Sequence, residues 1–238
     1  MSIVNFQFAK RNAKLKFEIT EKWIMREFKT ASLADQVFEK LENDIIHGVY
    51  PKGEILTELK LVEQLGVSRT PIREALRRLE QERLIEDTGK GSRVVGITEE
   101  DVLDIMNIRL HLEGLAAYYA TKNMTYEGLQ ELGHIVDLQD FYFAKWDVER
   151  LRMADDEFHE CICRLSKRSV IKDTLLPLHR KTRRYRKIAM EDRERAARTL
   201  REHREIYNAI VAKNAELAAQ LSEKHIEQAR EHMLGRVR

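Results

Sequence analysis

Glycine, proline and cysteine are scarce in this sequence of 238 residues, which has 10 Gly, 3 Pro and 2 Cys. So few chain breakers disfavour sheet-rich folds with many tight turns. Cys161 and Cys163 stand two apart and would point in different directions on a helix, so we expect two reduced thiols rather than a disulfide framework. No apolar run approaches the length of a membrane span, and the first residues lack the apolar segment of a secretory signal. These absences predict a cytoplasmic protein that has no membrane partner.

A large excess of charge of one sign is also absent, because 42 Lys and Arg are balanced by 40 Asp and Glu, for a formal net charge of +2. Affinity for nucleic acid would therefore have to come from a local basic surface. What the chain does have is a hydrophobic fraction of 43% and a charged fraction of 34%. This composition is typical of a helix-rich chain with a sizeable core, and the length predicts two domains.

The most informative stretch is residues 68–82, SRTPIREALRRLEQE. Positions four apart form one ridge on a helix, and three arginines follow that spacing: Arg69, Arg73 and Arg77. The neighbouring face is apolar and suits burial: Ile72, Leu76 and Leu79. Ser68 and Thr70 can cap the helix, and Pro71 is tolerated in its first turn. Such a helix suits the major groove of DNA, although arginines on an isolated helix are equally often only a solvated face.

The flanking segments favour DNA binding. Residues 56–66 have the apolar spacing of another short helix, and a Gly-Val turn precedes Ser68, which is the helix-turn-helix arrangement. Residues 84–87 and 92–95 are predicted strands, joined by the glycine-rich turn 88–91. We expect this hairpin to be the wing of a winged helix, with Lys90 at its basic tip. An earlier helix is predicted over residues 32–47.

Two segments, DIIHGVYPKGE (44–54) and LGVSRTPIREALRRLE (65–80), resemble the N-terminal domain of the GntR family of bacterial transcription regulators. In that family a helix ending in I-x-x-G precedes a P-G-x-x-L bend and the run S-R-T-P-V-R-E-A-L. The resemblance covers about residues 32–95, and it implies that DNA is contacted by Ser68, Arg69, Thr70 and Arg73, with Gly91 at the wing tip. Arg77 and Lys90 complete our set of candidate DNA-binding residues. Two departures are Arg83 in place of the family's glycine in E-G-L, and Leu59 in place of a basic residue.

From residue 98 onwards the sequence predicts only helices, over about 98–122, 125–143, 147–166, 168–190, 193–212 and 215–235. Short connections favour an antiparallel bundle. The expected fold is therefore mainly α, with a winged helix-turn-helix domain at 31–97 and an all-α bundle at 98–238. Residues 1–30 form a basic N-terminal extension, which the sequence does not distinguish from a DNA-backbone arm or a poorly ordered tail.

Histidines on separate predicted helices of the bundle suggest a metal site. Asp155 and His159 stand four apart and share a helix face, while His203 and His225 belong to later helices. Three imidazoles and a carboxylate from three helices suit a divalent transition metal. Asp156 also fits the helical spacing. The alternative is that these residues are ordinary members of the 8 histidines in the chain.

The same residues resemble the FCD domain, the effector-binding bundle of the FadR-like subgroup of the GntR family. Its pattern D-x-x-F-H, then E-H-x-x-I/L, then a last histidine is matched by Asp155, Phe158, His159, Glu202, His203, Ile206 and His225. The resemblance covers roughly residues 100–238 and implies zinc, nickel or a similar ion at Asp155, His159, His203 and His225, with a small organic acid beside it. Lys167 and Arg168 replace the family's usual Gly-Asn.

Arg109 matches an arginine that the FCD family directs at its effector, and it could bind a carboxylate that also meets the metal. The alternative is a surface ion pair with Glu113, four residues on. His134 and His179 are further residues that could line the pocket, although neither matches a motif position.

Together these observations predict a dimeric, ligand-responsive transcription regulator that binds double-stranded DNA at a palindromic operator and senses a small carboxylate. It would not be an enzyme. The alternative hypothesis is a metal-dependent hydrolytic or acid-processing enzyme with an attached DNA-binding domain. It is disfavoured because no separate acid–base carboxylate stands at a recognisable position. A third hypothesis is an architectural DNA-binding protein without an effector.

Overall fold

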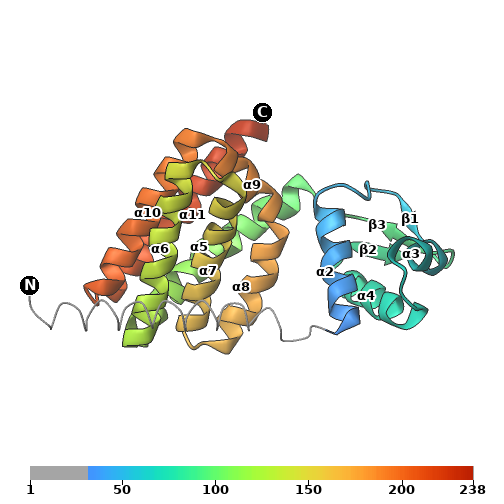
Figure 1. The fold of residues 1–238 in the computed structure, drawn as a ribbon, viewed down its shortest axis with the longest axis horizontal. Helices are drawn as coiled ribbons and strands as arrows, with labels where there is room; N and C mark the ends of the chain where they lie inside the picture. Colours follow the sequence, from blue (N-terminus) through green and yellow to red (C-terminus); the bar gives the residue numbers. More distant parts are fainter. Residues whose placement is uncertain (1–31, 238) are drawn as a thin grey trace, which may run out of the picture. The chain divides into compact units, whose positions relative to one another are not determined.

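The computed structural model describes residues 32–237, apart from the side chains of residues 184 and 235–237. The expected N-terminal extension, residues 1–30, lies outside this range. The chain divides into two compact units between Gly96 and Ile97, and Figure 1 shows a small mixed unit and a larger helical unit. Each unit is described by itself below.

The first unit has the winged helix-turn-helix arrangement. Its elements in chain order are α2 (Leu33–Ile46), β1 (Ile55–Leu56), α3 (Glu58–Leu65), α4 (Arg69–Gln81), β2 (Ile85–Asp87) and β3 (Ser92–Val94). The strands pair antiparallel in the order β1-β3-β2, so the predicted hairpin of β2 and β3 is present and a short third strand flanks it. Apolar residues from all three helices and the hairpin form the core of this unit: Val37, Leu41, Ile45, Leu61, Ile72, Leu79, Ile85 and Val94.

Caps explain where the helices of this unit begin. The N-cap residue Ser32 forms a capping box with Asp35 at the start of α2. The second helix begins at Glu58, two residues later than predicted, because the Thr57 side chain accepts a hydrogen bond from the Lys60 backbone N–H (3.3 Å). The apolar Leu56, which the spacing assigned to this helix, instead lies fully buried in β1.

The second unit is an all-α bundle of seven described helices, which Figure 1 shows packed side by side. They are α5 (Glu99–Lys122), α6 (Tyr126–Lys145), α7 (Val148–Leu165), α8 (Ser169–Lys181), α9 (Arg183–Glu191), α10 (Arg193–Val211) and α11 (Ala215–Val237). Their buried apolar residues, with Phe158 of α7 and Ile206 of α10 among them, form the core. None of the helices within residues 32–237 is both long and apolar enough to span a membrane.

The single helix predicted over residues 168–190 is wrong, because the chain breaks at Thr182 into α8 and α9. The Thr182 hydroxyl donates to the carbonyl of Leu178 (3.0 Å) in the last turn of α8 and accepts a hydrogen bond from Arg109 of α5 (3.1 Å). A threonine hydroxyl that bonds the preceding turn competes with helix continuation. The break separates α8 from α9, and residues of α9 line the cavity described below.

Candidate metal centre and DNA interface

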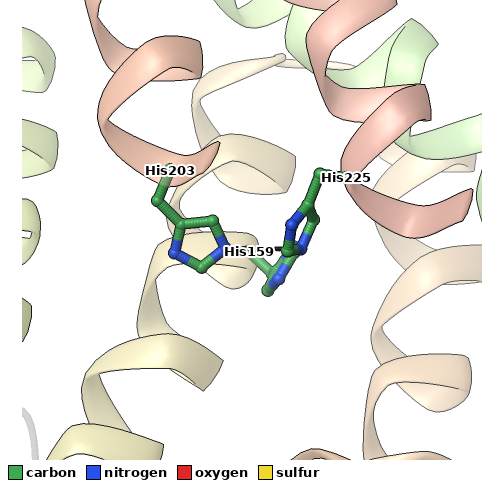
Figure 2. A group of neighbouring side chains, drawn as sticks. All are labelled: His159, His203 and His225. Atoms are coloured by element: carbon green, nitrogen blue, oxygen red, sulfur yellow. Dashed lines mark hydrogen bonds between the residues drawn. The ribbon is translucent and has the colours of Figure 1, made fainter. Parts of the chain in front are cut away.

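Three histidines from three helices meet inside the bundle, as Figure 2 shows: His159 of α7, His203 of α10 and His225 of α11. All three are buried. Each offers one nitrogen, and these nitrogens lie within 4.8 Å of one another. The closest recorded approach joins Nε2 of His203 to Nε2 of His225 at 3.3 Å. The three predicted histidine ligands are therefore brought together.

The other ring nitrogen of each histidine, Nδ1, has its own oxygen acceptor. The partners are Glu113 Oε2 for His159 (3.5 Å), Gln139 Oε1 for His203 (3.1 Å) and Glu202 Oε2 for His225 (2.6 Å). The Gln139 amide is itself oriented, because its nitrogen donates to the Ala154 carbonyl (3.1 Å). A ring that donates from Nδ1 and stays neutral presents a lone pair at Nε2.

The electrostatics of the site disfavour the charged form of two of the histidines and favour the ionised form of the two carboxylate partners, Glu113 and Glu202. Burial lowers the pKa of both His159 and His203 well below the usual range. Burial alone would raise the pKa of Glu202, but hydrogen bonds from His225 and Arg195 lower it to about 2. Burial opposes the ionisation of Glu113 as well, but His179, Arg109 and His159 hold its pKa well below the ordinary value. One nitrogen from each of the three rings thus converges on a common point, which is a donor set for a cation.

The predicted carboxylate ligand, Asp155, lies beside this cluster without being part of its tightest group. Its Oδ1 is 3.9 Å from Nε2 of His203, and its Oδ2 is buried with no hydrogen-bond partner among the described residues. Burial raises the pKa of Asp155. Asp156, the other candidate, accepts a hydrogen bond from Arg152 (2.9 Å). Asp156 Oδ1 is likewise buried without a hydrogen-bond partner, but Asp155 is the one of the two recorded beside a histidine of the cluster, which favours it as the fourth ligand. Three imidazoles with a carboxylate fit a divalent transition metal.

Arg109 is fully buried, so the alternative of a surface ion pair with Glu113 is wrong. The two side chains do pair, but in the interior: Nε and Nη2 of Arg109 donate to Glu113 Oε1 at 3.0 and 2.8 Å, and Nη1 donates to Thr182. His179 joins the same carboxylate, with Nε2 2.7 Å from Oε1. Arg109 is thereby fixed beside the candidate metal site, with most of its donors already used.

A cavity of about 40 Å³ adjoins the histidines. Its walls include Asp155, His159 and His225 from the candidate metal site, together with Arg109, Thr182 and Arg186. A water molecule needs roughly 10–15 Å³ of such space, so the cavity holds about three water-sized groups. This is room for a small ligand in direct contact with the candidate metal site.

Several residues of the site were not predicted as members. Gln139 and Arg186 lie outside every motif, while Glu113 had been considered only as a surface partner of Arg109. Glu202 was noted for its place in the E-H pattern and His179 as an unmatched pocket residue. In the structure each of these histidines is paired with an acid or an amide. The partners are 23 to 66 residues apart in sequence, so no local pattern pointed to the pairs.

The first unit presents most of the predicted DNA-binding side chains at one element, α4. Ser68, Arg69, Thr70, Arg73 and Arg77 are all exposed in or just before α4. Ser68 is the N-cap residue, but its side chain makes no cap hydrogen bond. Arg78, on the inner side of the helix, instead packs over the Phe38 ring and pairs with Asp35. The ridge of three arginines therefore faces solvent, and the fourth arginine stabilises the fold.

Arg73 differs from its neighbours because it is held by a carboxylate. Its Nε and Nη2 donate to the two oxygens of Glu58 in α3, at 2.9 and 3.1 Å. The side chain nevertheless remains 70% exposed. A bidentate pair restricts the guanidinium to one orientation on the surface of the helix-turn-helix.

The wing tip is formed by Gly89 and Lys90, both exposed, rather than by Gly91. The Gly91 carbonyl accepts from the Thr88 N–H (3.0 Å), so Gly91 closes the turn. It has φ +141°, and a Cβ there would lie 2.8 Å from Ile55 Cγ2 and 2.9 Å from the Leu56 carbonyl. Glycine is required at this position because β1 passes so close. The expectation of Gly91 at the outer tip is corrected accordingly.

A winged helix-turn-helix unit with an exposed arginine ridge, joined in one chain to a helical unit, is the arrangement of a DNA-binding regulator of transcription. The comparisons with known proteins agree. Residues 33–95 match the family model "Bacterial regulatory proteins, gntR family", and residues 104–228 match the FCD domain. The chain belongs to the GntR family of transcription regulators and carries an FCD domain.

Relatives support the same assignment, and a solved structure shares the fold. The chain is 31% identical to the HTH-type transcriptional regulator YdhC of Bacillus subtilis, over 83% of this chain and 89% of that protein. It is 33% identical to the gluconate operon transcriptional repressor of Bacillus licheniformis, over 63% of this chain and 60% of that protein. The fold is similar to that of McbR/YncC of Escherichia coli, with a TM-score of 0.73 and 23% identity over 88% of this chain and 100% of that one. The family and these names indicate a regulator and not an enzyme.

Proposed function

We propose that this protein is a dimeric, metal-dependent repressor that senses a small organic acid in its helical unit. The α4 ridge and the wing tip would contact a palindromic operator, one half-site for each subunit, because a two-fold protein matches a two-fold site. The residues in contact with DNA would be Ser68, Arg69, Thr70, Arg73, Arg77 and Lys90. Asp155, His159, His203 and His225 would hold a zinc, nickel or similar ion.

The observation that carries the proposal is the orientation of the three rings. Each Nδ1 has a separate oxygen partner, and one nitrogen of each ring lies within 4.8 Å of the others inside the bundle. Buried nitrogens that converge in this way need a shared partner, and a cation bound by all three would supply one. A divalent ion at this position would also polarise a bound carboxylate oxygen, while the cavity beside it limits the ligand to a few heavy atoms.

Repression is supported by the relatives whose names state a role. The gluconate operon repressors of two Bacillus species are 33% and 30% identical to this chain, each over 63% of its length. A repressor releases DNA when its ligand binds the weakly DNA-binding state more tightly. An acid in the cavity would therefore favour the state with lower operator affinity.

The metal assignment is tested by elemental analysis of the purified protein beside His203→Ala and His134→Ala. His134 is exposed on α6, so the substitution His134→Ala removes one imidazole and leaves the three clustered histidines in place. We expect about one equivalent of transition metal per chain in the wild type and in His134→Ala, and a loss of metal in His203→Ala. No metal in the wild type after addition of zinc or nickel would refute the metal site.

The DNA-binding half of the proposal is tested separately. DNA fragments enriched from a random pool by the protein should share an inverted repeat, and sedimentation should give two chains per duplex. Arg69→Ala should weaken binding to the enriched sequence, since a single arginine contact with a base or phosphate contributes roughly 1–3 kcal/mol. An asymmetric site bound by one chain would contradict the dimeric arrangement.

A further inference from the structure

One arginine of the cavity has hydrogen-bonding capacity to spare. Arg186 of α9 lines the cavity, and its side chain is 11% exposed. Its Nη2 donates to the His179 carbonyl (2.9 Å), whereas its Nε and Nη1 are buried and have no hydrogen-bond partner among the described residues. Buried guanidinium donors without an acceptor are uncommon, because their desolvation is not compensated.

The other cavity arginines are held more completely by protein groups. Arg109 uses Nε, Nη1 and Nη2 on Glu113 and Thr182. Arg195 donates from its two terminal nitrogens to both oxygens of Glu202, at 2.7 and 3.2 Å, and only its Nε has no hydrogen-bond partner among the described residues. Arg186 leaves two of its three nitrogens without such a partner, so an anion that entered the cavity could accept from it without displacing a protein carboxylate.

The charges around Arg186 favour the same choice once a cation occupies the histidine site. The only carboxylates recorded within ion-pair distance of Arg186 among the described residues are Asp155 Oδ2 at 3.7 Å and Asp156 Oδ1 at 3.2 Å, neither in hydrogen-bond geometry. Asp156 is shared with Arg152 and Arg183. When Asp155 turns to a metal ion, Arg186 loses one of its two counter-ions. The region then carries a surplus of positive charge that an anion can balance.

We propose that Arg186, rather than Arg109, is the residue that anchors the effector, and that the effector is a small carboxylate held between Arg186 and the metal. The proposal rests on the metal site proposed above. Arg109 is a positioning residue, which fixes Glu113 and the Thr182 break from which α9 begins. The cavity of about 40 Å³ has room for a short-chain acid.

Binding is measured by isothermal titration calorimetry on the zinc-loaded full-length protein, with acetate, glycolate and malonate as probes and acetamide as the uncharged control. Arg186→Met removes the guanidinium at similar length, and Arg186→Lys retains the charge. Lys187→Met is the matched control, because Lys187 is the exposed next residue of α9. Zinc content and melting temperature are recorded for every variant.

We expect at least one of the acids to bind the wild type and Lys187→Met equally, and Arg186→Met about ten- to a hundredfold more weakly, with zinc content unchanged. Equal affinity in Arg186→Met would overturn the proposal, as would a zinc-loaded wild type that binds none of the three acids. If the wild type holds no metal, the metal proposal fails. Arg186-dependent acid binding in that protein would still support the arginine assignment, and its absence would refute it.

Discussion

At the scale of single residues, the two thiols show how burial controls reactivity. Cys161 and Cys163 are free and fully buried, and burial raises the pKa of Cys161 to about 12. A thiol with a raised pKa stabilises the folded state below the pKa of the unfolded chain, near 9, and this contribution is lost as the pH rises to about 12. We expect the folded protein to resist thiol reagents and Cys161→Ala to have a flatter alkaline stability profile. Denaturant titrations across this pH range check the profile.

Two adjacent wing residues should separate stability from DNA binding. Gly91→Ala places a Cβ against Ile55 and the Leu56 carbonyl at a strained φ, which should cost roughly 1–3 kcal/mol of unfolding free energy. Lys90→Ala, at the exposed tip, should leave the unfolding free energy unchanged and weaken DNA binding. The slope of the logarithm of DNA affinity against the logarithm of salt concentration should fall by the amount that corresponds to about one phosphate contact. Thermal melts and binding isotherms at several salt concentrations compare the two. A destabilised Lys90→Ala would contradict this division.

At the scale of elements, α3 and α4 are connected by the Glu58–Arg73 pair. Glu58→Gln removes the carboxylate that orients Arg73, and the freed guanidinium can reach any nearby phosphate. We therefore expect affinity for random DNA to rise, affinity for the operator to rise less, and discrimination between them to fall. The control is Glu63→Gln, an equal charge change at an exposed position of α3. If both variants change the two affinities alike, only net charge matters and the pair has no role in specificity.

The elements were predictable from sequence wherever their causes are local. The Ser32 and Thr98 capping boxes, the Gly66 turn with φ +66° and the apolar stripe of α2 all depend on residues a few positions apart. The break at Thr182 was missed because its partner Arg109 lies 73 residues earlier. Strand β1 was missed because two residues carry no periodicity and exist as a strand only through pairing with β3.

The candidate site also contains residues that could be predicted from sequence and residues that could not. Helical spacing and motif resemblance identified the three histidines and Asp155. The acceptors that orient the rings could not be found, since they come from other helices and acquire their role only in the packed bundle. Arg109 and Glu113 illustrate the limit: their i, i+4 spacing is visible, but burial, which turns a weak surface pair into the support of the site, is a tertiary property.

At the scale of the whole molecule, metal should stabilise one unit and leave the other unaffected. A ligand at a hundred times its Kd adds about 2.7 kcal/mol to the stability of the state that binds it. Because all four candidate ligands belong to residues 97–238, we expect chelation to lower the melting temperature of the helical unit only. Hydrogen exchange, followed separately in the two units, measures how far the chelator destabilises each one. His203→Ala is the control, and we expect its exchange to be insensitive to the chelator. Equal protection changes in the core of α2 would contradict it.

The two units should also be coupled, and the coupling must be reciprocal. If an acid bound at Arg186 lowers operator affinity by a given factor, operator DNA must lower acid affinity by the same factor, and such factors are typically 5- to 150-fold. The operator Kd is measured with and without saturating acid on the zinc-loaded protein, and the acid Kd with and without saturating operator. In the wild type, we expect the ratio of the two operator Kd values to equal the ratio of the two acid Kd values. In Arg186→Met, both ratios should be near one, and the operator affinity without acid should match that of the wild type. An acid that changes operator affinity equally in both proteins would act elsewhere, for instance directly on the DNA-binding unit, and the helical cavity would then not be the sensor.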